Sequence, residues 1–258
     1  MSDKILSLHE IKRYSRQILL PEIGVSGQEL LKQAKVIIVG AGGLGCPVLQ
    51  YLAAAGIGRL AVAESGMVDE SDLQRQILYG SNDVGKLKSI IAAVRIESLN
   101  DLVKIDRINL RIEAANALRV LADYDIIVDA TDNYPTRFLL SDASVILNKP
   151  MVHGAIYKYE GQVSVFNYRG GPTYRCFNPN PLQADFRNPA SDETGLLGVV
   201  PGITGTIMAN EVIKIITGYG DILSGKLLIL NIYDYVFRIL KLECVPENHN
   251  INRLNETY

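Results

Sequence analysis

The chain has 258 residues, and its 26 Lys and Arg against 28 Asp and Glu give a formal net charge of −2 at pH 7. This near balance provides no overall electrostatic attraction for nucleic acid or for an anionic membrane, and we expect neither as a partner. With 48% hydrophobic and 21% charged residues the chain can bury a sizeable core, which excludes a disordered or low-complexity class.

The chain divides into three parts by pattern. Residues 1–33 are typical of an N-terminal arm of two short amphipathic helices, followed by a single main domain at 34–245 and a polar tail at 246–258 that we expect to fray. The N-terminus does not resemble a signal peptide, and the three cysteines are odd in number and widely spaced. We therefore expect a reducing, cytoplasmic setting.

Short apolar runs rich in β-branched residues recur along the main domain, and helical patterns fill most of the gaps between them. This alternation predicts an α/β fold with a parallel sheet built from βαβ units. The predicted strands are 35–39, 60–64, 103–108, 125–130, 151–156 and 162–167, with a final antiparallel pair at 226–232 and 237–242. The predicted helices are 46–55, 84–100, 113–121, 134–147 and 203–217, and a crossover loop is expected at about 168–200.

A glycine-rich segment follows the first predicted strand. Gly40, Gly42, Gly43 and Gly45 match G-x-G-x-x-G in the required context of a strand before and a helix after. Glycine permits positive φ and close backbone approach, and unpaired amides at the start of a helix favour phosphate oxygens. Glu64 lies 19 residues after Gly45, where a Rossmann-type site places a carboxylate on ribose hydroxyls. The pattern predicts a nucleotide site and leaves ATP and NAD both open.

Further motifs occur in a fixed order along the chain. Ser71-Asp72-Leu73-Gln74-Arg75-Gln76, Val84-Gly85-Lys86-Leu87-Lys88 and Asp129-Ala130-Thr131-Asp132-Asn133 resemble the adenylation domain of the MoeB, ThiF and HesA family, bacterial relatives of the ubiquitin-activating enzymes. The resemblance begins at Arg13-Tyr14-Ser15-Arg16-Gln17 and extends to Gly225-Lys226. It implies a Rossmann-like homodimer with a mixed sheet that uses Mg-ATP to adenylate the C-terminal Gly-Gly carboxylate of a small ubiquitin-like sulfur carrier, releasing pyrophosphate.

The resemblance also implies roles for single residues. Arg75 and Lys88 would face the ATP phosphates, Asp132 would hold Mg²⁺ beside them, and Arg16 would reach into the partner subunit's site. Ser71, Asp72 and Gln76 would help to orient the nucleotide. A carboxylate that attacks a polyanion needs such cations around the phosphates. Asp132 could also, or instead, serve as the N-cap of the helix predicted from Tyr134.

The chain departs from the family at several positions. Many members hold a structural zinc with two C-x-x-C pairs, but Thr173-Tyr174-Arg175-Cys176 and the positions near Asn248 and Ile251 keep one of the four ligands. We therefore expect no zinc, with Cys244 and His249 off the family spacing. Ser191 lies in the segment that carries the sulfur-transfer cysteine in ThiF-like enzymes, so we expect a separate sulfur-donor protein.

Three further departures lie beside the expected nucleotide site. Glu64 stands where the family usually has Asp, Asp72 where it often has Asn, and Gly66 where an acidic residue is common. Asp72 adds negative charge near the phosphates, and we expect altered ATP affinity or Mg²⁺ dependence. Cys46 is expected to pack in the core, and the three histidines match no triad or metal spacing.

Four functions remain open. The leading hypothesis is a MoeB-like adenylyltransferase in a molybdopterin-type pathway. The others are ThiF-like activation in thiamine thiazole synthesis, an NAD-dependent oxidoreductase and a non-catalytic partner-binding homologue. The oxidoreductase hypothesis gives no role to Arg75, Lys88 and Asp132 as a cationic and metal-binding set. The sequence does not name the carrier or its pathway.

Overall fold

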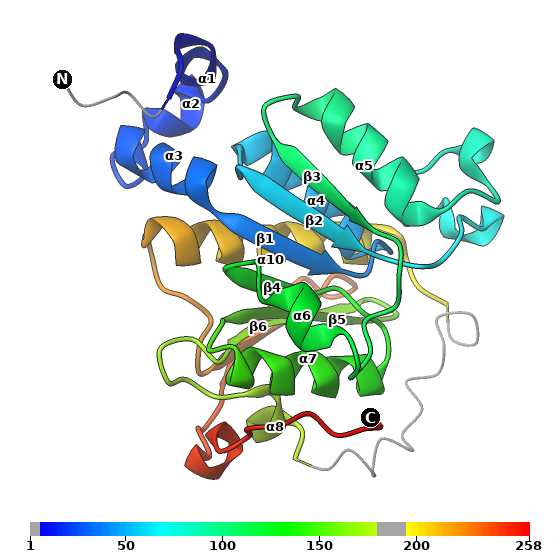
Figure 1. Cartoon of the computed structure of the whole chain (residues 1–258), viewed down its shortest axis with the longest axis vertical. Helices are drawn as coiled ribbons and strands as arrows, with labels where there is room; N and C mark the ends of the chain where they lie inside the picture. The colour runs from blue at the N-terminus through cyan, green and yellow to red at the C-terminus, as the bar shows by residue number, and fades with distance from the viewer. Residues whose placement is uncertain (1–5, 180–194) are drawn as a thin grey trace.

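The computed structural model describes residues 6–179 and 195–258 (Figure 1). Its centre is an eight-stranded sheet of order β3-β2-β1-β4-β5-β6-β7-β8. The strands are β1 (Lys35–Val39), β2 (Arg59–Ala63), β3 (Lys104–Ile108), β4 (Ile126–Asp129), β5 (Met151–Tyr157), β6 (Glu160–Phe166), β7 (Lys226–Asn231) and β8 (Val236–Lys241). The helices are α1 (Leu8–Arg13), α2 (Ser15–Ile18), α3 (Gly24–Gln33), α4 (Gly45–Ala55), α5 (Lys88–Leu99), α6 (Ala117–Leu121), α7 (Tyr134–Ile146), α8 (Tyr174–Phe177) and α10 (Val199–Thr217).

The sheet is mixed. The pairs from β3 through β5 are parallel, and the pairs from β5 through β8 are antiparallel. The α/β fold with antiparallel C-terminal strands is therefore confirmed. The strands β5 and β6 pair antiparallel because only Lys158 and Tyr159 separate them. A parallel crossover needs about a dozen residues or more, whereas a two-residue connection forms a hairpin.

Alternation within the strands distributes the core over both faces of the sheet. In β1, Val36 and Ile38 join the cluster that packs under α4, α5 and α10, whereas Ile37 and Val39 join the cluster under α6 and α7. Both clusters consist of buried side chains that are mainly aliphatic, and the second also contains aromatic rings such as those of Phe138 and Tyr174. A strand buried on both faces reads as a continuous apolar run, which is the pattern of Val36-Ile37-Ile38-Val39.

Two helix boundaries differ from expectation for local reasons. The helix expected from residue 84 begins at Lys88, because Gly85 adopts φ +79°, which no helix contains. The helix expected from residue 203 begins at Val199 and accommodates Pro201 in its first turn, where a missing N–H costs nothing. By length and composition α10 is the candidate membrane span of the described chain, but it packs on α4, β5 and β6 as core helices do.

The N-terminal arm and the C-terminal tail both dock on the main domain. The arm contains three helices instead of two, and the Gln17 and Gln28 side-chain amides donate to the Ala55 carbonyl at the end of α4. The tail was expected to fray, but the Tyr258 hydroxyl donates to the buried Asp142 carboxylate at 2.7 Å. Residues 180–194 of the expected crossover loop, Ser191 among them, lie outside the described residues. The described part of that loop includes the short helix α8.

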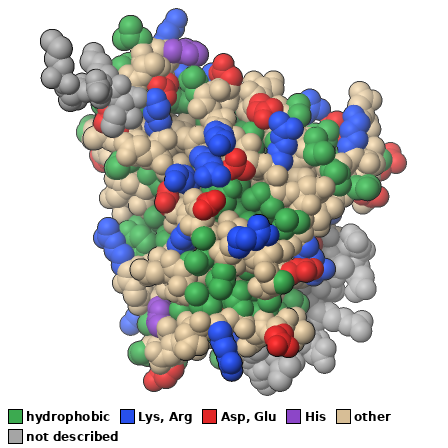
Figure 2. Space-filling model, in the orientation of Figure 1, with side chains coloured by type: hydrophobic (Ala, Val, Ile, Leu, Met, Phe, Trp, Pro, Cys, Tyr) green, Lys and Arg blue, Asp and Glu red, His purple; other side chains and the backbone are tan. Residues whose placement is uncertain are grey.

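Charged side chains are interspersed on the face seen in Figure 2, and neither sign dominates it. This distribution agrees with the net charge of −2.

Candidate functional site

The candidate site lies where the strand order reverses. Sequential strands run outward from β1 in one direction to β2 and β3 and in the other to β4 and β5. In open α/β sheets, ligands bind in the crevice at such a switch point, beyond the carboxyl ends of the strands. The glycine loop at residues 40–45 follows β1 and the segment 130–133 follows β4, so the topology brings the two motifs together.

Two glycines of the loop are required by its geometry. Gly40 adopts φ +95°, and a Cβ there would lie 2.7 Å from the Ala130 carbonyl oxygen. A Cβ on Gly45 would lie 2.0 Å from the carbonyl oxygen of Gly40. The loop therefore folds back on itself and against the segment after β4, which only glycine allows.

The loop presents unpaired backbone amides. Helix α4 begins without a side-chain cap, and in the described chain the amides of Gly42, Gly43, Leu44 and Gly45 donate no hydrogen bond. Four successive unpaired donors at the positive end of an eleven-residue helix form an anion-binding site. This arrangement suits the phosphates of a nucleotide.

Glu64 lies one residue beyond β2 and organises the same loop. Its carboxylate accepts from the Ala41 amide at 3.1 Å and from the Gly66 amide at 2.7 Å. Because a carboxylate has about four lone-pair positions, both oxygens can still accept from ribose hydroxyls.

Below the loop, Cys46 is fully buried, and burial raises the pKa of its thiol to about 12, as expected of a packing residue.

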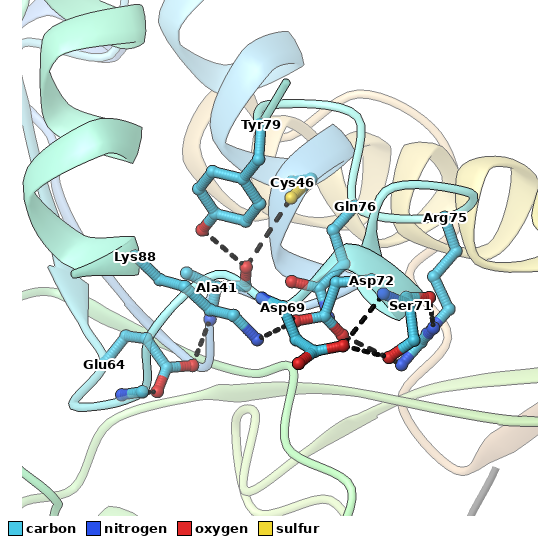
Figure 3. Close-up of polar contacts among 11 residues, drawn as sticks. Ala41, Cys46, Glu64, Asp69, Ser71, Asp72, Arg75, Gln76, Tyr79 and Lys88 are labelled. Atoms are coloured by element: carbon cyan, nitrogen blue, oxygen red, sulfur yellow. Dashed lines mark hydrogen bonds and ion pairs between the residues drawn. The ribbon is translucent and has the colours of Figure 1, made fainter. Parts of the chain in front are cut away.

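The motif after β2 supplies the charged side chains (Figure 3). Asp72 is nearly buried, and its carboxylate contacts Lys88 Nζ at 2.7 Å and Arg75 Nη2 at 3.1 Å. The Gln76 side-chain amide donates to the same carboxylate at 2.7 Å, while its own Oε1 is buried without a partner in the described chain. The structure thus brings Asp72, Arg75, Gln76 and Lys88 into one cluster beside the glycine loop.

Ser71 belongs to the turn that carries this cluster. The hydroxyl and amide of Ser71 donate to Asp69 at 2.6 and 2.8 Å, and the Asp69 amide donates to Asp72 at 3.2 Å. These hydrogen bonds lower the pKa of the exposed Asp69 carboxyl. The Ser71 side chain therefore shapes the turn, and the structure gives it a partner that the motif did not reveal.

Asp132 is exposed at the end of the segment after β4, where its carboxylate contacts only the Asn133 amide group, at 3.4 Å, within the described chain. The alternative N-cap role is wrong, because Asn133 caps α7 by accepting from the Thr136 amide. An accessible carboxylate with spare acceptor positions fits Mg²⁺, which binds through one or two carboxylates together with substrate phosphates.

The buried pair of Asp129 and His153, which was not among the predicted site residues, fixes the position of this segment. Asp129 and His153 are paired in register on β4 and β5, and Nδ1 of His153 lies 2.7 Å from the carboxylate. Burial lowers the pKa of His153. Burial opposes ionisation of Asp129, but the hydrogen bond from His153 lowers its pKa, so the imidazole is neutral and donates to a carboxylate. Asp129 also accepts from the Thr131 hydroxyl at 2.6 Å. Asp129 and His153 lie in the predicted strands 125–130 and 151–156, and a parallel register between those strands would have indicated this pair.

A cavity of about 350 Å³ lies next to that segment. Tyr134 and Arg137 of α7, His153 and the β5–β6 hairpin line it, together with Tyr174 of α8. Its lining is largely aromatic and polar, which suits an extended peptide better than a compact apolar ligand.

Arg16 does not join this cluster. It is exposed on α2, and the arm docks at the C-terminal end of α4, whereas the glycine loop lies at the N-terminal end. Eleven helical residues separate the two ends by roughly 15 Å. Within one chain, the side chain of Arg16 therefore does not reach the glycine loop.

The corner where α8 meets residues 244–249 is a second cysteine-containing region. Cys176 Sγ accepts from the Val245 amide at 3.3 Å and from the Asn248 side chain at 3.4 Å. Burial alone would raise the pKa of the Cys176 thiol, but these hydrogen bonds and those from Thr173 lower it. Cys244 lies 3.6 Å from His249 Nε2. In the described residues, no three His, Cys, Asp or Glu side chains are placed to hold a metal ion, and the absence of zinc stays a prediction.

The chain was compared with known protein families and sequences. The model of the ThiF family matches residues 14–250. A sulfur carrier protein adenylyltransferase of Thermus thermophilus is 46% identical over 242 residues, covering 92% of this chain and 89% of the relative. A probable molybdopterin-synthase adenylyltransferase of Porphyra purpurea is 45% identical, and an adenylyltransferase and sulfurtransferase of Aedes aegypti is 46% identical. Each match covers 92% of this chain, but only 62% and 54% of those longer relatives.

Solved structures show the same architecture. PaaA has a TM-score of 0.79 at 27% identity, covering 94% of this chain and 76% of that one. MccB of E. coli, in a crystal structure with ATP, has a TM-score of 0.80 at 23% identity, covering 95% and 75%. At such low identity the MccB match supports the fold alone.

Proposed function

The chain belongs to the ThiF family, and on that premise we propose that it is an adenylyltransferase that activates a small sulfur-carrier protein. The full-length similarity to the Thermus sulfur carrier protein adenylyltransferase carries this proposal. The substrate is the C-terminal Gly-Gly carboxylate of a ubiquitin-like carrier, and the co-substrate is Mg-ATP. The products are carrier adenylate and pyrophosphate.

The glycine loop binds the nucleotide. The free amides of Gly42 to Gly45 face the phosphates, and Glu64 accepts from the ribose hydroxyls while it holds the loop. Arg75 and Lys88 supply the fixed positive charge that a phosphoryl site requires. Ser71 and Gln76 shape the turn beside the loop, and Asp72 pairs with both cations before the nucleotide binds.

The reaction joins the carrier carboxylate to the α-phosphorus of ATP. A carboxylate oxygen forms the new bond to phosphorus, and the bond between the α-phosphorus and the bridging oxygen of pyrophosphate breaks. Asp132 would hold Mg²⁺, which would neutralise charge on the phosphates. The cavity beside Tyr134 and Arg137 offers room for the extended C-terminal segment of the carrier.

The site is completed by a second subunit. Arg16 is too far from the glycine loop of its own chain, so in a homodimer the arm of one subunit supplies Arg16 to the other. This proposal explains an exposed arginine that has no hydrogen-bond or ion-pair partner in the described chain.

A separate protein donates sulfur to the carrier. The three free cysteines suit a reducing, cytoplasmic setting.

The decisive experiment is carrier-dependent exchange of radiolabelled pyrophosphate into ATP. Small β-grasp proteins from the same genome that end in Gly-Gly are each tested with the purified protein. We expect exchange with one of them, in the presence of Mg²⁺, and none with the same carrier lacking its final glycine. Absence of exchange with every carrier, or reduction of NAD in place of exchange, would contradict the proposal. The responding carrier distinguishes a molybdopterin-type pathway from thiazole synthesis.

A further inference from the structure

Asp72 places a negative charge among the groups that the proposed function assigns to the ATP phosphates. Asp72 is 6% exposed, and besides the two cations its oxygens accept from the Asp69 amide and the Gln76 side chain. Lys88 Nζ lies 2.7 Å from one oxygen, and Arg75 Nη2 lies 3.1 Å from the other. Before a nucleotide binds, both cations are therefore already paired with one carboxylate of the same chain.

The cations and the glycine loop are in direct proximity. A Cβ on Gly43 would lie 3.6 Å from Arg75 Cγ, and a Cβ on Gly42 would lie 3.7 Å from the Gln76 amide nitrogen that donates to Asp72. The carboxylate and the phosphates of a nucleotide on this loop would therefore share the same donors. Figure 3 shows the Lys88 nitrogen pointing toward Asp72, between Glu64 and Arg75.

The charges of this cluster favour a less anionic ligand. Asp72 contacts both Lys88 and Arg75, so a phosphate bound to either cation would lie beside a second negative charge. Each negative charge on an incoming phosphate is repelled by a carboxylate that water barely reaches and salt barely screens. Mg-ATP carries about half the negative charge of free ATP, so the repulsion falls most heavily on the free nucleotide.

We propose that Asp72 makes the site selective for metal-bound nucleotide, by competing with phosphate for Lys88 and Arg75. This inference deepens the proposed function and rests on it. With asparagine at this position, the single amide oxygen could accept from either Gln76 or the Asp69 amide, and Lys88 and Arg75 would be released to phosphate. Asp72 is in this sense a specificity-determining residue.

Direct binding measurements test the inference without a carrier. Affinities for ATP in EDTA and for ATP in excess Mg²⁺ are measured by calorimetry for the wild type, Asp72→Asn and Asp69→Asn. For Asp72→Asn we expect free ATP to bind about tenfold more tightly than to the wild type, and Mg-ATP only about threefold more tightly. Asp69→Asn removes the same charge from the same turn, but its carboxylate is exposed and contacts neither cation. We expect it to change both affinities less than twofold.

The outcomes separate this inference from the proposed function. Equal tightening by Asp69→Asn would indicate a general charge effect, and weaker ATP binding by Asp72→Asn would indicate that the carboxylate positions the cations; either result overturns the inference. If Asp72→Asn does not fold, as judged by its unfolding transition, Asp72→Ser is measured in its place with the same expectations. A wild type that binds no nucleotide would overturn both proposals. Binding as expected, with no carrier adenylated, would overturn the proposed function alone.

Discussion

The glycine loop and the α8 corner are held by different kinds of interaction. The loop is held by backbone geometry and charge: Gly45 has no room for a side chain, and Asp72 binds two cations. The corner is held by weak acceptor contacts, in which Cys176 receives hydrogen bonds from Val245 and Asn248. A region whose geometry is tied to chemistry tolerates little change, whereas a region that joins two segments through weak contacts tolerates more.

We expect the largest loss of activity from a change beside the glycine loop. Asp132→Ala should lower carrier-dependent pyrophosphate exchange at saturating Mg²⁺ by about a hundredfold or more, because Mg²⁺ beside the phosphates loses its protein ligand. Asp123→Ala removes an exposed carboxylate at the opposite end of β4 and should leave exchange unchanged. An unfolding transition like that of the wild type is required of both variants. Normal exchange by Asp132→Ala would exclude Asp132 from the mechanism.

The next prediction tests whether one chain supplies every residue of the nucleotide site. Arg16→Ala and Lys88→Ala subunits should each be inactive, but mixing them equally should restore about one quarter of the exchange, because one site in each mixed dimer is intact. Lys88→Ala mixed with Asp132→Ala is the matched control. Both of those residues belong to the same chain's site, so no recovery is expected. Recovery in the control, or none with Arg16→Ala despite proven subunit exchange, would contradict a site shared between subunits.

The corner should matter for stability and not for chemistry. Adenylation transfers no sulfur, so a variant lacking all three cysteines should still form carrier adenylate. Cys176→Ala leaves the Val245 amide without its acceptor and should cost about 1 kcal/mol of unfolding free energy, whereas Cys176→Ser should cost less. Denaturant unfolding and exchange rates are measured on the same samples. A folded, ATP-binding variant that forms no adenylate would show that a thiol takes part.

The smallest effect concerns the buried His153, which is held neutral. Because its pKa is lowered on folding, the unfolded chain binds more protons below about pH 6.5, and the free energy of unfolding should fall as the pH drops from 7 to 5. The depressed pKa of Asp129 acts in the same direction at still lower pH. His153→Asn keeps an N–H donor for Asp129 without a titrating ring, so its unfolding free energy should depend less on pH in this range. An unchanged slope would show that other groups cause the dependence.

Much of the fold could be predicted from local pattern. The run Val36 to Val39 and the glycines after it predict a strand, a tight turn and a helix start, and these are signals carried by neighbouring residues. Helix boundaries were less predictable, because Gly85 and Pro201 act through backbone angles that depend on the surrounding chain. The antiparallel direction of β6 follows from a connection of two residues, shorter than the five that separate the predicted strands 151–156 and 162–167.

The sequence by itself determined which residues could form a nucleotide site, because glycine spacing and an ordered set of cations and carboxylates are local properties of the chain. Only the tertiary structure decided how those residues are paired. Long-range contacts set Asp72 against Lys88 and His153 against Asp129, and placed Arg16 at the far end of α4 from the glycine loop. Such contacts join residues distant in the chain, and their geometry follows from strand register and helix packing, which no local pattern encodes.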